Sequence, residues 1–359
     1  KVTSRQLPEG GFAFYVANPY LYPVQLEVTF PRLLNMQADV RIPFFIVLPP
    51  QTPEKRIIVL KPGESGRYGY NLSYLVFPGD PEKQPDAAFK YRLPFRHGTK
   101  HKVGQGYFGP FSHSTRYGEY ALDFDMKEGT PVLAAREGLV VETKQDGTLH
   151  GLTSDYAKHG NYVLVMHEDG TFARYLHLRY GGVTVAVGDR VQAGQELGYS
   201  GNTGWTSGPH LHFQVAAPER MRLRTIPTDF HLEENRTGRL APGLYYYAWH
   251  PGGAPFTRLF GIDITNDTHA GHDKQVPRDD KVDVRTEQVD DTILFFARNG
   301  KAGVVTLTLT PSGLRNVTAS KPLPLTVKLP PGREIFLFLL RPADPARDWG
   351  YGYQLSYTW

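Results

Sequence analysis

Two segments near opposite ends of the chain carry the same pattern of residues at a nearly constant offset. The N-terminal copy contains, in order, Val24–Val28, Leu48–Pro50, Leu60–Pro62 and Gly69–Tyr74. The C-terminal copy contains, in the same order, Val305–Leu309, Leu329–Pro331, Leu340–Pro342 and Gly352–Tyr357. Matching residues are 280 to 283 positions apart throughout. Four matched features at a nearly constant offset indicate a duplicated domain, and short alternating strands between proline and glycine turns predict a β-sandwich.

The stretch between the two copies also predicts strands. A hairpin is expected from residues 162–166 and 171–178, which flank the turn Glu168-Asp-Gly170. Almost no segment keeps a helical period beyond one or two turns, and the chain contains 37 glycines and 29 prolines. We therefore predict an all-β protein in which a central antiparallel sheet is flanked by two related β-sandwich-like domains. The predicted domains are residues 1–90, 91–235 and 241–359, joined by linkers at 79–94 and 233–243.

Composition excludes several classes of function. The chain has no cysteine, which excludes disulfides, thiolate chemistry and zinc sites built from cysteine. It has no run of about 18 apolar residues, so no membrane span is expected. No basic cluster is interleaved with aromatic residues, so no nucleic-acid partner is expected, and a net charge of +4 is too small to identify one. The chain opens at Lys1 rather than methionine, which favours a removed leader or an expressed fragment.

The strongest chemical signal is a His-x-His pair at the end of a glycine-rich stretch. His210 and His212 enter a β-type segment two positions apart, so both imidazoles are expected on one face of a strand. The polar, glycine-rich residues 200–209 lead directly into the pair, as expected where a substrate approaches the backbone closely. This arrangement could place one nitrogen on a metal ion and another beside it.

Upstream segments supply possible partners for this pair. Asp123 lies on the polar face of an alternating run, and His113 lies ten residues before it in a polar segment. A second alternating run is expected to place Tyr175, His177 and Arg179 on one face. A catalytic zinc site needs three ligands of the His, Asp or Glu type and one open position for water. The candidate ligands are therefore His113, Asp123 and one histidine of the final pair.

A series of motifs over about residues 104–216 resembles one enzyme family. In order they are His…Asp-Phe, Gly-Thr-Pro-Val-x-Ala, Tyr-x-His-Leu, Val-Gly-Asp-x-Val-x-x-Gly-Gln-x-Leu-Gly and Gly-Asn-Thr-Gly-x-x-x-Gly-Pro-His-Leu-His-Phe. This series is similar to the lysostaphin/LytM-type zinc endopeptidases, bacterial enzymes that cut peptide cross-links in cell-wall peptidoglycan. The resemblance covers well under half of the chain, and it is specific because several spaced elements occur in the correct order.

The resemblance implies one Zn²⁺ per chain, held by His113, Asp123 and His212. Many family members have three residues between the first histidine and the aspartate, whereas nine separate His113 from Asp123 here. This departure leaves His101 and His97 as competing ligands. His113 is favoured because it is nearest to the aspartate and has the Ser-His context seen in some relatives.

The resemblance also implies catalytic roles beside the metal for His177 and His210. One imidazole would take the proton of the attacking water and the other would donate to the developing oxyanion, and the sequence does not assign the two roles. Asn202 and Tyr175 are implied to lie near the substrate. The implied partner is a peptidoglycan peptide, and the implied location is outside the bacterial cytoplasm, either periplasmic or extracellular.

A second interpretation is a non-catalytic or autoinhibited wall-binding protein that regulates other peptidoglycan hydrolases. Family members of that kind have typically lost metal ligands, whereas all five expected histidine and aspartate positions are intact here. The sequence therefore favours an enzyme. It leaves open which peptide bond is cut, whether the wall is the bacterium's own, what the flanking domains do and whether the protein forms oligomers.

Overall fold

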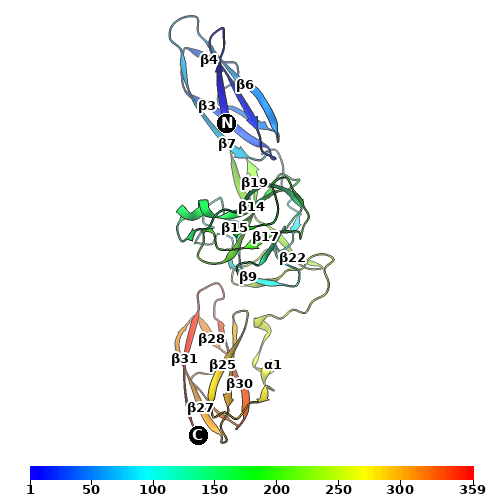
Figure 1. Ribbon diagram of the computed structural model, residues 1–359, viewed down its shortest axis with the longest axis vertical. Coiled ribbons are helices and arrows are strands. Elements are labelled where there is room, and N and C mark those ends of the chain that lie inside the picture. Colours follow the sequence, from blue (N-terminus) through cyan, green and yellow to red (C-terminus); the bar gives the residue numbers. More distant parts are fainter. The chain divides into compact units, whose positions relative to one another are not determined.

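The computed structural model describes residues 1–359 and is nearly all-β, which confirms the predicted fold class (Figure 1). The helical elements are short: η1 (Ser154–His159), η2 (Gly261–Asp263) and α1 (Asn266–His269). None of these helices is long and apolar enough to cross a membrane. The chain forms two compact units. The first contains Lys1–His101, Gln105–Leu240 and Ala248–Gly253, and the second contains Lys102–Gly104, Ala241–Tyr247 and Ala254–Trp359.

The N-terminal part of the first unit is a sandwich of two antiparallel sheets. One sheet has the order β1 (Val2–Gln6), β2 (Phe12–Asn18), β6 (Thr52–Pro62) and β4 (Met36–Ala38). The other has the order β5 (Phe44–Leu48), β3 (Val24–Leu34) and β7 (Gly69–Pro78). Alternating apolar residues from both sheets, among them Phe14, Leu26 and Ile58, are buried in one core. Period-two alternation thus gives each strand one buried face.

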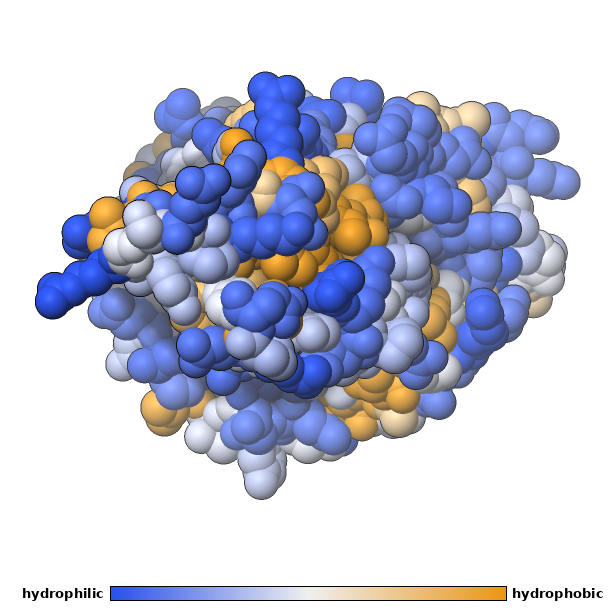
Figure 2. Space-filling model, turned by 90° about the horizontal axis from the view of Figure 1, so that it is seen from above, coloured by the Kyte–Doolittle hydropathy of each residue, from blue (hydrophilic) through white to orange (hydrophobic).

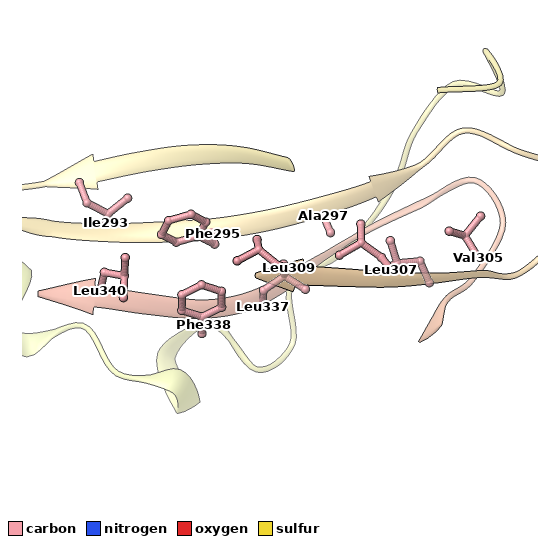
Figure 3. Packing of buried hydrophobic residues seen from close by; sticks show 10 residues of the cluster. Ile293, Phe295, Ala297, Val305, Leu307, Leu309, Leu337, Phe338 and Leu340 are labelled. Carbon is pink, nitrogen blue, oxygen red and sulfur yellow. The ribbon is translucent and has the colours of Figure 1, made fainter. Parts of the chain in front are cut away.

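The C-terminal part of the second unit repeats this strand order. One sheet runs β24 (Asp273–Gln275), β30 (Arg333–Pro342), β26 (Thr292–Asn299) and β25 (Val282–Val289), with β28 (Val317–Ala319) also paired to β30. The other sheet runs β29 (Leu325–Leu329), β27 (Val305–Arg315) and β31 (Gly350–Thr358). Figure 3 shows the core of this sandwich, where the rings of Phe295 and Phe338 stack with centroids 4.6 Å apart. Figure 2 shows the whole molecule from above, where hydrophilic residues dominate the visible face and smaller hydrophobic groups reach the surface between them.

A buried asparagine makes the same contact in both sandwiches. The Asn18 side-chain amide donates to the carbonyl of Leu48 at 3.2 Å, and Asn299 donates to Leu329 at 3.0 Å. Each asparagine oxygen also accepts a backbone N–H two residues later, from Tyr20 and from Lys301. Equivalent strands and equivalent hydrogen bonds occur in both sandwiches, as expected for the predicted duplication.

Most of the central sheet lies in the first unit. Its path runs β16 (Arg190–Val191), β12 (Gly138–Lys144), β14 (Asn161–Met166), β15 (Phe172–Val183), β19 (His210–Glu219), β10 (Leu122–Asp125) and β9 (Lys100–Gln105). Three further strands join it: β11 (Pro131–Leu133), β17 (Glu196–Ser200) and β20 (Arg222–Ile226). Smaller sheets of the first unit contain β8 (Lys90–Tyr91), β13 (His150–Gly151), β18 (Gly204–Trp205), β21 (Asp229–Glu233) and β22 (Arg236–Gly238), and β23 (Tyr245–Tyr247) belongs to the second unit. The predicted hairpin is confirmed as β14 and β15.

Polar contacts join the N-terminal sandwich to the central sheet within the first unit. The fully buried Gln25 donates to the carbonyl of Glu219 at 2.9 Å and accepts the N–H of Met221 at 2.7 Å. The Tyr22 hydroxyl donates to Glu142 at 2.6 Å. The predicted bounds at residues 90, 235 and 241 stay a prediction of domain organisation.

Removal of residues 254–359 tests that organisation. Every residue expected to hold the metal belongs to the first compact unit, so we expect the truncated protein to bind as much zinc per chain as the full-length protein. Metal content can be measured by mass spectrometry of the purified proteins, with circular dichroism to establish that each is folded. Loss of the metal from a folded truncated protein would show that the C-terminal part completes the site.

Candidate metal centre

Strand pairing brings an aspartate and a histidine together in the central sheet. In the antiparallel pair of β10 and β19, Asp123 is directly opposite His212. Side chains at opposed positions share one face of a sheet, with Cβ atoms about 4.5–5.5 Å apart. His212 Nδ1 consequently lies 2.9 Å from Asp123 Oδ1, and both residues are buried. This cross-strand pair forms the base of the cluster.

A loop between β9 and β10 adds the third member. His113 Nε2 lies 3.2 Å from Asp123 Oδ1 and 3.3 Å from His212 Nδ1. His113 is completely buried. Two ligands of a tetrahedral zinc ion with bonds of about 2.0–2.1 Å are separated by roughly 3.3 Å. The three facing atoms therefore have the donor types and the mutual spacing that a tetrahedral metal ion requires, and the cluster could bind one.

The hydrogen-bond partners of the two histidines fix which nitrogen faces the cluster. His113 Nδ1–H donates to the carbonyl of Gly106 at 2.8 Å. His212 Nε2–H donates to the side-chain oxygen of Gln214 at 2.9 Å. Because each of these partners can only accept, the outward nitrogen of each ring is the donor to it, and the other ring nitrogen is the one available to a metal ion. Both of these nitrogens face Asp123, in the arrangement in which an outer acceptor orients a metal-binding imidazole.

Two further histidines lie beside the cluster, each with one ring nitrogen bonded to an outward acceptor. His177 Nδ1–H donates to the carbonyl of Thr203 at 2.6 Å, and His210 Nδ1–H donates to the carbonyl of Gly208 at 2.8 Å. The two rings are 4.6 Å apart between centroids. His210 Nε2 lies 3.6 Å from Asp123 Oδ1. In each ring, Nε2 is therefore the nitrogen not engaged by this hydrogen bond.

Burial and neighbouring groups set the charges in the cluster. Burial favours the neutral carboxyl of Asp123, but hydrogen bonds from His113 and His212 outweigh it and hold its pKa well below the ordinary value. Burial lowers the pKa of His113, and the Asp123 carboxylate more than offsets this, so the net shift is upward. Burial, followed by the neighbouring histidines, lowers the pKa of His177 well below its ordinary value. The cluster thus combines an anionic carboxylate with a neutral imidazole.

Comparison with known proteins identifies the segment that contains most of this cluster. The model of peptidase family M23 matches residues 117–222. Residues 117–222 form a lysostaphin/LytM-type M23 domain. The chain is 42% identical over 116 residues to glycyl-glycine endopeptidase ALE-1 of Staphylococcus capitis, which is 32% of this chain and 29% of that protein. It is 42% identical over 93 residues to peptidoglycan DD-endopeptidase ShyA of Vibrio cholerae, which is 26% of this chain and 19% of that protein.

The solved catalytic domain of lysostaphin from Staphylococcus simulans is 31% identical, with a TM-score of 0.27, and the match covers 35% of this chain and 87% of that domain. The chain spans less than a third of the length of the curated relatives it matches. His113 lies just before the matched range, in the loop that leads into the M23 domain.

The competing histidines lie outside the cluster. His101 Nδ1–H donates to the carbonyl of Asp125 at 2.9 Å, and its ring packs against Phe95. His97 accepts the backbone N–H of His250 at 2.9 Å. The structure therefore brings His113, rather than His97 or His101, to Asp123.

The two residues expected near the substrate differ in their placement. Asn202 accepts a hydrogen bond from Thr206 at 3.1 Å, and the Thr206 hydroxyl lies 3.2 Å from His210 Nδ1, so Asn202 borders the cluster. Tyr175 is completely buried, and its hydroxyl accepts the backbone N–H of Ala135 at 2.7 Å. Its ring packs against Phe213 in the core of the M23 domain. The structure does not bring Tyr175 to the cluster.

A bulge explains why the expected alternation along β15 is wrong. Asn161 of β14 pairs with Leu178, and Tyr162 pairs with Leu176, so His177 has no partner in the register. His177 has a left-handed backbone, with φ of 69°, which is uncommon for a residue with a side chain and typical of functional sites. The extra residue breaks the two-residue period that predicted a shared face for Tyr175 and His177.

The structure adds residues that sequence reasoning missed. Gln214 is two positions after His212 in a strand, so a shared face with it was predictable. Gly106 and Thr203 act through backbone carbonyls, and no side-chain pattern indicates such a role. Gln105, whose side chain donates to Asp123 at 2.9 Å, lies at the end of a different strand and gave no signal.

Replacement of Tyr175 by phenylalanine separates a structural role from substrate binding. The change removes the hydroxyl that accepts the buried N–H of Ala135, so we expect a stability loss of about 1–3 kcal/mol. We expect an unchanged KM because Tyr175 lies in the core rather than at the cluster. Denaturant unfolding and steady-state kinetics measure the two quantities. A raised KM at unchanged stability would instead support a substrate contact.

Proposed function

We propose that the chain is a zinc-dependent endopeptidase that hydrolyses peptide cross-links of bacterial cell-wall peptidoglycan. The observation that carries this proposal is the convergence of His113 Nε2, Asp123 Oδ1 and His212 Nδ1 beside the lone pairs of two further histidines. The M23 domain that contains most of these residues supports a peptidase. The names of the relatives, a glycyl-glycine endopeptidase and a peptidoglycan DD-endopeptidase, support the substrate class.

The donor set suits zinc in particular. Two imidazole nitrogens and one carboxylate oxygen give three protein ligands, which is the number found in catalytic zinc sites with one position left for water. When bound, zinc would acidify that water toward a pKa of about 7 and polarise the scissile carbonyl. The outer acceptors at Gly106 and Gln214 keep both imidazoles oriented for coordination.

His210 and His177 are proposed as the residues that move protons. The Nδ1–H of each is held by a backbone carbonyl, so Nε2 is the atom available to the reaction. An imidazole with a free Nε2 lone pair can accept the proton of the attacking water and return it to the leaving amine. His210 is adjacent to Asp123, and His177 packs against His210, so both atoms are near the ligand cluster. Asn202 is proposed to contact the substrate at the same edge.

This activity requires export, because peptidoglycan lies outside the cytoplasm. The proposed location is accordingly periplasmic or extracellular, with a peptidoglycan peptide as the partner and one zinc ion per chain.

Digestion of purified peptidoglycan sacculi tests the proposal directly. We expect the zinc-loaded protein to release soluble peptides with new amino termini, because amide hydrolysis creates one terminus for each bond cut. Mass spectrometry of the products would identify the bond, and a chelated sample serves as the control. Absence of released peptide from a protein with zinc bound would contradict the enzyme and favour a wall-binding regulator.

Two substitutions separate metal binding from proton transfer. His212→Ala should lose both zinc and activity because it removes a ligand. His210→Ala should retain zinc and lower kcat by a factor of about 10² to 10⁴, the usual contribution of a general acid or base. Metal analysis and peptide release measure these effects, with His269→Ala in the second unit as the matched control. Turnover of His210→Ala at the rate of the unaltered protein would refute its role.

A further inference from the structure

Two consecutive residues, Gln105 and Gly106, form hydrogen bonds with two of the three proposed ligands. The Gln105 side-chain nitrogen donates to Asp123 Oδ2 at 2.9 Å. The carbonyl of the next residue, Gly106, accepts the Nδ1–H of His113 at 2.8 Å. The end of β9 therefore contacts both the strand that carries Asp123 and the loop that carries His113.

The Gln105 carboxamide donates two hydrogen bonds and accepts one. Its nitrogen also donates to the hydroxyl of Ser112 at 2.9 Å, and its oxygen accepts the N–H of Phe111 at 3.0 Å. Both of these partners belong to the segment immediately before His113. A carboxylate has no donor for Asp123, and a hydrocarbon has neither a donor nor an acceptor, so only a carboxamide satisfies all three partners.

The packing around Gln105 indicates that its position is built into the loop. A Cβ atom at Gly109 would lie 2.2 Å from Gln105 Cγ and 2.8 Å from Gln105 Oε1. The backbone of Gly109 is not left-handed, so the absent side chain is needed for space rather than for conformation. The lack of a side chain at Gly109 thus provides the space that the Gln105 side chain occupies.

We propose that Gln105 is a positioning residue for the metal centre. Its amide engages Oδ2 of Asp123, which leaves Oδ1 as the oxygen that faces His113 and His212. Through Phe111 and Ser112 it also restrains the loop, so that His113 Nε2 is held where Asp123 Oδ1 is presented. This inference rests on the proposed zinc function and adds a residue that the M23 match at 117–222 does not include.

Zinc affinity of the full-length chain tests the proposal by competition with a chromophoric chelator. Gln105→Leu preserves side-chain bulk but removes all three hydrogen bonds, and we expect zinc to bind about 10- to 100-fold more weakly, as is usual when an outer partner of a ligand is lost. Gly109→Ala should weaken zinc binding in the same direction, because the new methyl group displaces Gln105. Gln192→Ala, an exposed glutamine of the M23 domain, is the matched control and should keep the original affinity.

Thermal unfolding of the zinc-free proteins distinguishes positioning from a general structural role. A purely structural residue would lower the melting temperature of the zinc-free chain and leave the zinc affinity of the folded protein unchanged, and that result would overturn the proposal. If Gln105→Leu does not fold, Gly109→Ala decides: original affinity in a folded Gly109→Ala protein also overturns it. Absence of zinc binding by the unaltered chain would overturn the proposed function itself, which separates the two failures.

Discussion

The buried carboxylate of Asp123 is the group on which the rest of the site depends. An ionised carboxylate that is removed from water is costly unless hydrogen bonds and opposite charges compensate for it. The register of β10 against β19 supplies His212 opposite Asp123, a loop supplies His113, and β9 supplies the amide of Gln105. These partners hold the pKa of Asp123 low despite its burial. The strand pairing thus makes an anionic ligand possible inside the sheet.

Hydrogen bonds to outward acceptors also orient the four histidines of the site. Four imidazoles meet around one carboxylate, and unrestrained rings in such a group could donate to one another and block a metal ion. Each ring instead donates one N–H to an outward acceptor, three of them backbone carbonyls and one the Gln214 side chain. The second nitrogen of each ring faces inward, two toward Asp123 and two beside it. The nitrogen that each ring directs into the site is therefore determined mainly by backbone carbonyls of loops rather than by neighbouring side chains.

Sequence alone predicted the parts of this arrangement that follow from strand periodicity. Alternation placed Asp123 on a polar face and His210 with His212 on one face, and the constant offset predicted two equivalent sandwiches. The shared face expected for Tyr175 and His177 was wrong, because the bulge at His177 breaks the two-residue period between them and Tyr175 keeps the regular register opposite Phe213. Gln105 and the backbone acceptors were not predictable, since their contacts depend on how loops return to the sheet, and loop paths have no periodic signature.

The long spacing before Asp123 gives the Gln105 contacts their significance. Where three residues separate the two ligands, as in many members of the family that the sequence resembles, the chain itself keeps them close. With nine residues between them, the loop has more conformations to lose when His113 docks, and ordering each residue costs about 1–2 kcal/mol of backbone entropy. Contacts from outside the loop have to compensate for that cost. Gln105, the last residue of β9, and Gly106 make such contacts at both ligands. These contacts replace the restraint that a short spacing provides.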